Sequence, residues 1–350
     1  MKRSKKVLMF AVIMFVLILS ACSGGSNETS SDGDGGGKSD KYKLTMNVAY
    51  PPSKVEDDVL MNGTKRFAEL IEERTNGQVK VEVFYSNQLV PQDQLIDALK
   101  TGTVDFGYSA PQYYGDTIPT AFFSNLPFFG RDIDHMMSLI REKGIDKIVD
   151  QEMEQYGVKL LFYGPTGEYG LMSKKPIKSI DDVKGMSVRA AGGLWTPWYE
   201  SLGASPVNVA AAEIYEALQR GTVDAVPYPF YTLNDYSYHE VVNSITIPGI
   251  IPSAVTANFI SLKTWNELPK DIQTIITEVS KEIELENVEK YRLVQENALK
   301  FAKENGVEVI ELTDKEYDRF VESSQVVWDE FAKMNENTKK IVEIMREDMK

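Results

Sequence analysis

Two segments far apart in the chain share one ungapped motif, and this internal repeat limits the possible folds more than any other feature of the sequence. Residues 95–105 and residues 214–224 both contain Ala-Leu-x-x-Gly-Thr-Val-Asp. Each copy follows a similar unit, in which a helix ends near a glycine and the chain passes into a strand. We therefore predict two related halves, each with the order helix, glycine, strand, helix, glycine, strand. These preceding units cover residues 57–73 and 79–84 in the first half, and residues 195–202 and 206–209 in the second.

The glycines and apolar residues of the repeat predict how each copy folds. Gly102 and Gly221 follow helix ends, where a left-handed backbone favours glycine because glycine has no Cβ. Helices that alternate with strands predict an α/β fold with open, mostly parallel sheets. Four apolar residues recur at helical spacing and should face a core, namely Leu95, Leu99, Ile214 and Leu218.

The segments at the carboxyl ends of the predicted strands are rich in aromatic residues. Open α/β sheets bind ligands beyond these ends, here residues 107–113 and 226–231. The rings in question are Tyr108, Tyr113, Tyr114, Tyr228, Phe230 and Tyr231. A single ring is more often an ordinary core residue, so the rings alone do not define a site. Two similar halves that face each other nevertheless predict a binding cleft.

A long helix is predicted over residues 271–305, where it would extend about 50 Å and run across both halves as a brace. A strand over residues 255–262 precedes it and should cross back from the second half, and residues 314–349 should form one or two amphipathic helices. With 350 residues the chain is long enough for two domains. We expect lobe one to comprise residues 42–166 with about 254–290, and lobe two residues 167–253 with about 291–350.

The N-terminus reads as an export signal. Four basic residues precede an apolar core of 13 residues, 7–19, which is shorter than the roughly 20 residues of a membrane-spanning helix. The core ends in Leu19-Ser20-Ala21-Cys22, which resembles the lipobox of bacterial lipoproteins. We expect a signal peptide over residues 1–21, lipidation of Cys22 and a flexible tether over residues 22–41, and hence a protein held outside the cytoplasm on the membrane. The alternative is an uncleaved anchor in which Cys22 has no special role.

Composition argues against several classes of function. A net charge of −14 disfavours nucleic acid as a partner, and a single cysteine excludes internal disulfides and cysteine-based metal clusters. A hydrolase or lyase would need a nucleophile with a base, or a metal. His135 and His239 stand in no catalytic motif, and the pair Asp181-Asp182 suits a helix start without a metal. We predict no catalytic residue, metal or cofactor.

An ordered series of short motifs resembles the solute receptors of tripartite ATP-independent periplasmic (TRAP) transporters, the C4-dicarboxylate-binding-protein-like family. The resemblance covers the chain from about Tyr42 to the C-terminus, and no single motif carries it. The motifs are Asn87-Gln-Leu, Ala98-Leu-x-x-Gly-Thr-Val-Asp105, Leu126-Pro-Phe-Phe129, Pro176-Ile-x-Ser-Ile-Asp-Asp-Val-Lys-Gly-Met-Ser-Val-Arg189, Leu202-Gly-Ala-Ser-Pro206, Glu213-Ile-Tyr-Glu-Ala-Leu-Gln219, Gly221-x-Val-Asp224 and Trp265-x-x-Leu-Pro269. The family implies a two-lobed periplasmic-binding-protein-like fold, with the long helix spanning both lobes.

The resemblance implies that Arg189 binds the ligand's carboxylate through a bidentate pair. The residue itself suits this role, because its planar guanidinium offers two parallel N–H bonds that lysine cannot reproduce. Tyr169 stands where many acid-binding relatives have a second arginine, and Tyr228 stands where they have an asparagine. Ala211 occupies a position that is often phenylalanine. These departures favour a monocarboxylate with an apolar or aromatic body over a dicarboxylate.

The predicted mechanism is closure of the two lobes around a small organic acid, with no covalent chemistry. Arg189 would hold the carboxylate while Tyr108, Ser109 and Gln112 complete the wall of the first lobe. The resemblance implies that the closed form docks on the small and large membrane subunits of a TRAP transporter. A receptor lipoprotein of an ATP-driven transporter, and a sensory or adhesive lipoprotein, remain alternatives with the same two-lobed fold.

Overall fold

The computed structural model describes residues 42–53, 56, 58–190, 193–209 and 213–349. The predicted signal peptide, the tether and Cys22 lie outside these residues, and so does Ala211. The described residues belong to one compact unit. None of its helices combines the length and the apolar character that crossing a membrane requires.

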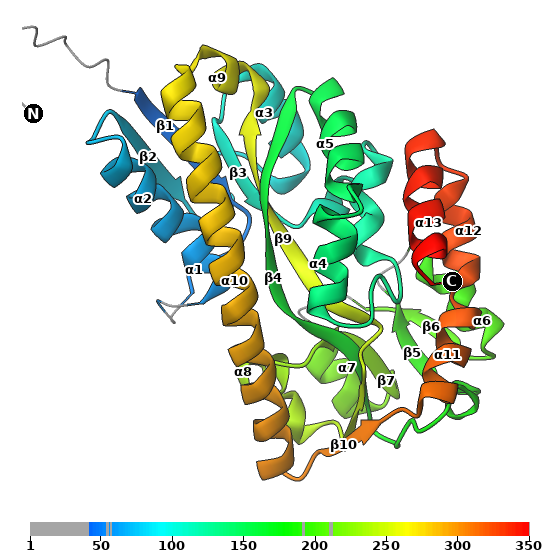
Figure 1. Cartoon of the computed structure of the whole chain (residues 1–350). Coiled ribbons are helices and arrows are strands. Elements are labelled where there is room, and N and C mark those ends of the chain that lie inside the picture. Colours follow the sequence, from blue (N-terminus) through cyan, green and yellow to red (C-terminus); the bar gives the residue numbers. More distant parts are fainter. Residues whose placement is uncertain (1–41, 54–55, 57, 191–192, 210–212, 350) are drawn as a thin grey trace, which may run out of the picture. The chain divides into compact units, whose positions relative to one another are not determined.

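One sheet of ten strands forms the centre of this unit (Figure 1). Its main path runs in the order β2-β1-β3-β9-β4-β7-β5-β6, while β8 pairs with β4 and β10 pairs with β8. The strands are β1 (Tyr42–Val48), β2 (Val79–Phe84), β3 (Phe106–Ser109), β4 (Val158–Ser173), β5 (Ser187–Ala190), β6 (Ser205–Asn208), β7 (Ala225–Pro229), β8 (Ser244–Ile247), β9 (Ile251–Ser261) and β10 (Glu308–Glu311).

The strands of each half pair in parallel, as the repeat predicts, but two long antiparallel strands join the halves into one sheet. β1 lies between β2 and β3, and β5 lies between β6 and β7, all in parallel. β9 crosses back from the second half and pairs antiparallel with β3 and with the 16-residue β4. The sheet is therefore mixed, whereas the sequence predicted mostly parallel sheets. Glycine and proline interrupt the apolar pattern of β4, so the length of this strand cannot be recognised in the sequence. The pairing of β4 with β9 shifts register at Pro165–Gly167 and Gly167–Tyr169.

The two copies of the repeat adopt the same local structure. Helix α3 (Leu95–Thr101) ends at Gly102 with φ of 74°, and helix α7 (Ile214–Arg220) ends at Gly221 with φ of 77°. The four apolar residues predicted to face a core are fully buried. The units that precede the repeats are also present, with α2 (Phe67–Arg74) before β2 and α6 (Trp195–Ser201) before β6. The first helix differs from its prediction, because it begins as α1 (Val59–Met61) and passes through a π-helical segment, η1 (Asn62–Arg66), before α2.

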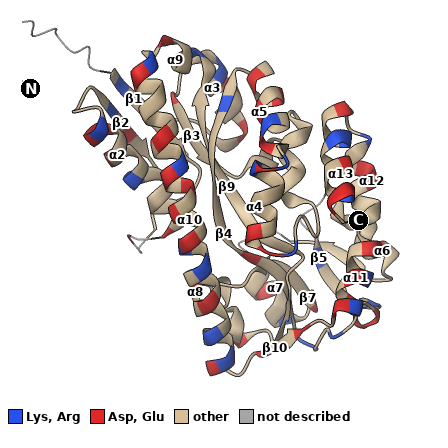
Figure 2. Ribbon diagram, in the orientation of Figure 1, with Lys and Arg blue, Asp and Glu red and all other residues tan. Residues whose placement is uncertain are grey.

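Helix α10 (Lys270–Glu304) is the predicted long helix, and it contacts both halves (Figure 1). Ile272, Ile276 and Val279 pack into the core beneath β1 and β2, whereas Ala298 and Ala302 pack into the core of α7 and β7. Charged residues follow the outer faces of the helices, while β9 in the centre of the sheet carries none (Figure 2).

The C-terminal segment contains three helices, not the one or two expected: α11 (Asp314–Ser323), α12 (Gln325–Ala332) and α13 (Glu336–Asp348). β10 precedes them, and the sequence analysis did not predict this strand. α12 packs on α6, and α13 packs on α5 (Ile145–Gln155), so the tail contacts both halves. The remaining α-helices of the described residues are α4 (Ile133–Arg141), α8 (Thr232–Asp235) and α9 (Leu262–Glu267).

Candidate functional site

Arg189 lies in β5, with β6 on one side and β7 on the other, and its side chain is enclosed by the protein. The residue is only 6% exposed. Its Nε donates a hydrogen bond of 3.1 Å to the carbonyl oxygen of Val209, and Nη1 donates one of 3.3 Å to the hydroxyl of Tyr169. The guanidinium carbon lies 5.5 Å from the ring centre of Tyr228. Both hydrogen bonds and the ring contact therefore involve neutral groups.

The charge of Arg189 is not neutralised within the described part of the chain. No carboxylate of a described residue lies within 4.0 Å of its guanidinium nitrogens. A buried cation without an anionic partner is costly, and a guanidinium has five N–H donors, of which the described neighbours accept two. The arrangement suits an anion that brings two acceptor oxygens, because a carboxylate can bond to the guanidinium in a bidentate manner.

Tyr169, in β4, accepts the hydrogen bond from the guanidinium of Arg189 through its hydroxyl. Its ring meets Trp195 edge to face at 5.8 Å and lies 5.9 Å from the ring of Tyr228. Burial raises the pKa of Tyr169, and the nearby positive charge of Arg189 partly lowers it. The phenol therefore remains neutral at physiological pH. Because it accepts a bond from Arg189, its own O–H remains able to donate to a bound acid.

Tyr228, in β7, contacts both the guanidinium of Arg189 and the ring of Tyr169, and it also contacts further tyrosines. Its ring lies 6.1 Å from that of Tyr238, which in turn lies 5.8 Å from that of Tyr236. Burial is the main cause that raises the pKa of Tyr228, and its neighbouring tyrosines raise it further. The structure thus brings together three of the predicted site residues, Arg189, Tyr169 and Tyr228.

The residues predicted for the first half lie at the end of β3 and in the 3₁₀ segment that follows it, η3 (Pro111–Tyr114). Tyr108 is fully buried and its hydroxyl accepts a bond of 2.6 Å from Thr256, as in a core residue. Ser109 is also buried, and Oε1 of Gln112 is buried without a hydrogen-bond partner among the described residues. No hydrogen bond, ion pair or ring contact within the described ranges joins these three residues to Arg189. Their role therefore stays a prediction.

Sequence reasoning missed several aromatic residues of the cluster around Tyr169 and Tyr228, and one backbone partner of Arg189. Trp195 was expected only as the first residue of a helix, and Tyr236 and Tyr238 were not among the predicted site residues. The signal that could have found the two tyrosines is their density just after β7, in Tyr236-Ser-Tyr238. The carbonyl of Val209 had no sequence signal, because every residue carries a carbonyl.

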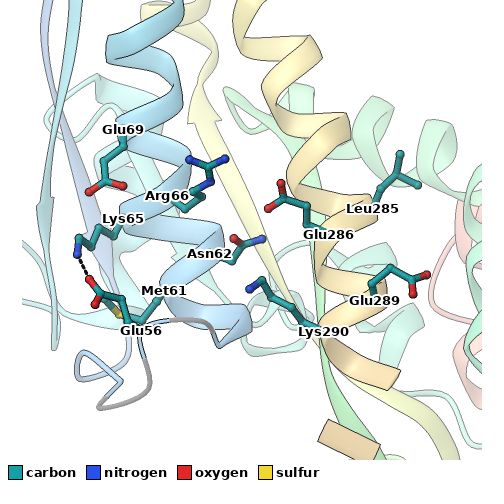
Figure 3. A pocket seen from close by; sticks show the side chains of 10 residues that line it. All are labelled: Glu56, Met61, Asn62, Lys65, Arg66, Glu69, Leu285, Glu286, Glu289 and Lys290. Atoms are coloured by element: carbon teal, nitrogen blue, oxygen red, sulfur yellow. Dashed lines mark hydrogen bonds and ion pairs between the residues drawn. The ribbon is translucent and has the colours of Figure 1, made fainter. Parts of the chain in front are cut away.

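A groove lies between the η1–α2 segment and α10 (Figure 3). It has a volume of about 800 Å³. Its lining residues are Glu56, Met61, Asn62, Lys65, Arg66, Glu69, Leu285, Glu286, Glu289 and Lys290, none of which was predicted to bind ligand. Acidic and basic side chains alternate there, and Lys65 pairs with Glu56 (Figure 3). Such internal pairing indicates a solvated surface groove.

The two histidines are engaged in structural contacts. Nε2 of His135 contacts Asp348, and Nδ1 of His239 lies 2.7 Å from the carbonyl oxygen of Leu233. Asp182 belongs to a capping box with Ser179, as expected of a helix start. Within the described residues no three histidine, cysteine or acidic side chains cluster in a way that could hold a metal ion.

The mixed sheet and its long helix form the fold of the periplasmic solute-binding proteins. The chain belongs to the bacterial extracellular solute-binding proteins of family 7, whose model matches residues 53–335. This match confirms the predicted family. Solved TRAP periplasmic solute-binding proteins share the fold of the chain, which confirms the predicted fold class. The family consists of extracytoplasmic receptors and not of catalysts, as the sequence analysis expected.

Three relatives illustrate the range of similarity. A monocarboxylate 2-oxoacid-binding periplasmic protein of Nostoc sp. is 30% identical over 241 residues, 68% of this chain and 66% of the relative. The sialic acid-binding periplasmic protein SiaP of Vibrio cholerae is 26% identical over 271 residues, 77% of this chain and 83% of the relative. The crystal structure of a TRAP solute-binding protein from Sulfitobacter sp. NAS-14.1 with bound β-D-galacturonate has a TM-score of 0.73 at 25% identity, over 87% of this chain and 99% of that one.

Proposed function

We propose that this TRAP receptor captures a small organic acid and holds its carboxylate on Arg189. One observation carries the proposal: the guanidinium is buried, and among the described residues it meets a carbonyl, a hydroxyl and a ring but no carboxylate. A ligand carboxylate would supply the missing negative charge. The relatives named above support this class of ligand, since 2-oxoacids, sialic acid and galacturonate all carry a carboxylate.

We further propose that the ligand is a monocarboxylate with an apolar or aromatic body. Tyr169 and Tyr228 contact Arg189 where a second arginine and an asparagine would offer polar groups to a second carboxylate. A screen of acids by thermal shift tests this proposal. It fails if only dicarboxylates such as succinate, malate or fumarate stabilise the protein.

The working mechanism is closure of two lobes, with the boundaries predicted from the sequence: 42–166 with about 254–290, and 167–253 with about 291–350. The register shifts between β4 and β9 support a hinge there, because irregular pairing leaves the backbone freer to bend. A ligand favours the closed form only to the extent that it binds that form more tightly than the open one. Tyr108, Ser109, Gln112 and Ala211 would complete the wall around the acid.

The proposal extends to the membrane. Acylation of Cys22 would anchor the protein to the bilayer through the tether over residues 22–41, and the closed receptor would deliver its acid to the small and large TRAP membrane subunits. Substitution of Cys22 with serine should release the protein from the membrane fraction and abolish labelling with a radioactive fatty acid. Adjacent genes for a four-span and a twelve-span membrane protein would support these partners, whereas an adjacent nucleotide-binding subunit would contradict them.

The most direct test identifies the ligand itself. Mass spectrometry of small molecules released from freshly purified protein should detect a carboxylic acid, and that acid should bind the stripped protein again. Recovery of a neutral or cationic ligand that binds equally well to the Arg189→Ala variant would refute the proposal.

A further inference from the structure

A strap of the first half packs against the second half. It combines the 3₁₀ segment η4 (Pro119–Asn125) with the motif Leu126-Pro-Phe-Phe129. The ring of Phe128 meets that of Trp198, in α6, at 6.1 Å, and the backbone N–H of Phe128 donates to the carbonyl oxygen of Ile250. Phe128 has a φ of 57°, a left-handed value that bulky residues rarely adopt. Such a backbone persists only where its surroundings hold it, so the strap is firmly attached at this point.

Two tryptophans donate hydrogen bonds to carbonyl oxygens of the strap. Nε1 of Trp195, the first residue of α6, donates to Asn125 over 2.9 Å. Nε1 of Trp328, in α12, donates to Pro127 over 2.9 Å. Both tryptophans are buried. The two bonds are therefore alike in chemistry, length and burial, and the tryptophans differ in what their rings contact.

The ring of Trp195 connects the strap to the candidate site. It meets the ring of Tyr169 edge to face at 5.8 Å, and the hydroxyl of Tyr169 accepts the hydrogen bond from Nη1 of Arg189. Three direct contacts thus lead from the carbonyl oxygen of Asn125 to the guanidinium: an indole bond, a ring contact and a phenol bond. Among the described residues, Trp328 has no ring contact with Tyr169.

A further contact brings the strap to the corner between β5 and α6. A Cβ added to Gly193, which lies just before α6, would be 3.9 Å from the tip of the Phe122 ring. β5 carries Arg189 and α6 begins at Trp195. The strap therefore packs beside the corner that joins these two residues, independently of the indole bond.

We propose that Trp195 is a positioning residue for acid binding: the strap holds its indole, and the indole fixes the ring of Tyr169 and with it the hydroxyl that orients Arg189. The inference rests on the proposed function, because it concerns the arginine proposed to hold the carboxylate. Edge-to-face contacts stabilise a ring beyond the area that it buries. A hydroxyl that is already held in place loses less freedom when a ligand binds, so the indole contact should increase the affinity for the acid.

A double-substitution cycle separates positioning from general packing. Calorimetry measures binding of acetate, pyruvate, 3-phenylpropanoate and the acid recovered from the purified protein. Trp195→Phe should weaken binding about threefold, less than Tyr169→Phe does, because the proposed route ends at the hydroxyl of Tyr169. In the Tyr169→Phe background, Trp195→Phe should therefore have no effect. Trp328→Phe is the matched control and should keep the parent's affinity, although it loses an equal bond to the strap.

A second measurement needs no change at Trp195. Coupling between two sites is reciprocal, so a bound acid should stabilise the strap by as much as the strap favours the acid. Backbone hydrogen exchange followed by mass spectrometry should become about threefold slower in residues 119–129 of the parent when acid saturates it. In Tyr169→Phe, saturated with the same acid, this protection should be absent. Residues 325–332, which include Trp328, provide the reference segment and should not change in either protein.

Different outcomes separate failure of this inference from failure of the proposed function. Parental affinity in Trp195→Phe, an equal loss in the Tyr169→Phe background or an equal loss in Trp328→Phe overturns the positioning role while carboxylate binding stands. A loss larger than that of Tyr169→Phe also overturns it, because Trp195 would then act by another route. If Trp195→Phe does not fold, the exchange measurement decides, and protection that persists in Tyr169→Phe refutes the proposal. If no carboxylate binds the parent, the proposed function fails, and the positioning role fails with it.

Discussion

Two arginines of this protein lie in contrasting surroundings. Arg141, at the end of α4, donates to both carboxylate oxygens of Glu284 through Nε and Nη2, and to Asp146 over 2.9 Å through Nη1. Arg189 donates to a carbonyl and a hydroxyl, and it is the more deeply buried of the two. The first arginine ties α10 to α4 and has its counter-charges within the fold. The second has none among the described residues, which is the arrangement expected of a site for an anionic ligand.

Because only Arg141 has counter-charges among the described residues, we expect replacement by alanine to have opposite consequences at the two arginines. Arg189→Ala should weaken acid binding about hundredfold or more, because it removes one partner of an enclosed charge pair. Arg189→Lys should retain only weak binding, since an ammonium group lacks the planar fork. Neither change should lower the melting temperature much, because no carboxylate within the described residues loses its partner. Titration calorimetry with the recovered ligand measures the effect, and parental affinity in Arg189→Ala would show that the site is elsewhere.

Arg141→Ala should instead destabilise the fold by about 3 kcal/mol and leave ligand affinity unchanged in the folded protein. The substitution would leave Glu284, which is 8% exposed, without its cation in the interior. Arg292→Ala is the matched control, because Arg292 also bonds across from α10 but its pair with Asp134 is exposed. The control should cost less than about 1 kcal/mol. Equal losses for the two variants in urea denaturation would contradict the structural role of Arg141.

Glu168 is a partly buried carboxyl that has no cation among its described partners, and it sharpens the contrast with Glu284. Glu168 accepts bonds from the backbone N–H of Gly249 and from Nε2 of Gln295, and burial raises its pKa from 4.5 to about 7. A folded-state pKa above the unfolded one means that this group stabilises the protein at low pH. That stability is lost as the pH rises through 7. Between pH 5 and pH 8 the loss should be about 2 kcal/mol.

The matched variant for this pH effect is Glu168→Gln, which keeps the side chain's size and cannot ionise. Its urea denaturation curves at pH 5 and pH 8 should differ by about 2 kcal/mol less than those of the parent. An identical pH dependence in both proteins would show that Glu168 does not titrate in this range.

The smallest expected effect concerns the hydroxyl that supports Arg189. Tyr169→Phe removes one hydrogen bond to the guanidinium and one possible donor to the acid, so affinity should fall about fivefold. Tyr199→Phe is the control, because its buried hydroxyl has no hydrogen-bond partner among the described residues. That variant should bind as the parent does. A loss in Tyr199→Phe equal to the loss in Tyr169→Phe would mean that general packing, and not the bond to Arg189, causes the effect.

Helix ends and core positions were predictable because they depend on residues close together in the sequence. Glycine after a helix end marked the ends of α3 and α7, and apolar spacing placed Leu95 and Ile214 in the core. β4 was not predictable, since a strand buried on both faces and interrupted by Gly164, Pro165 and Gly167 shows neither alternation nor a continuous apolar run. β10 was missed for another reason. A four-residue strand owes its existence to its partner β8, which lies more than 60 residues away in the chain.

The candidate site also combines features that the sequence indicated with features that only the tertiary structure decided. The sequence by itself indicated that the guanidinium of Arg189 suits a bidentate bond to a carboxylate, and the family resemblance indicated that Tyr169 and Tyr228 stand where relatives have polar groups. Only the tertiary structure decided that these residues touch, because contact between β4, β5 and β7 depends on sheet order. It also decided that Arg141 has two carboxylate partners and Arg189 none among the described residues. The chemistry of a side chain is local, but its counter-charges and its burial come from segments distant in the chain.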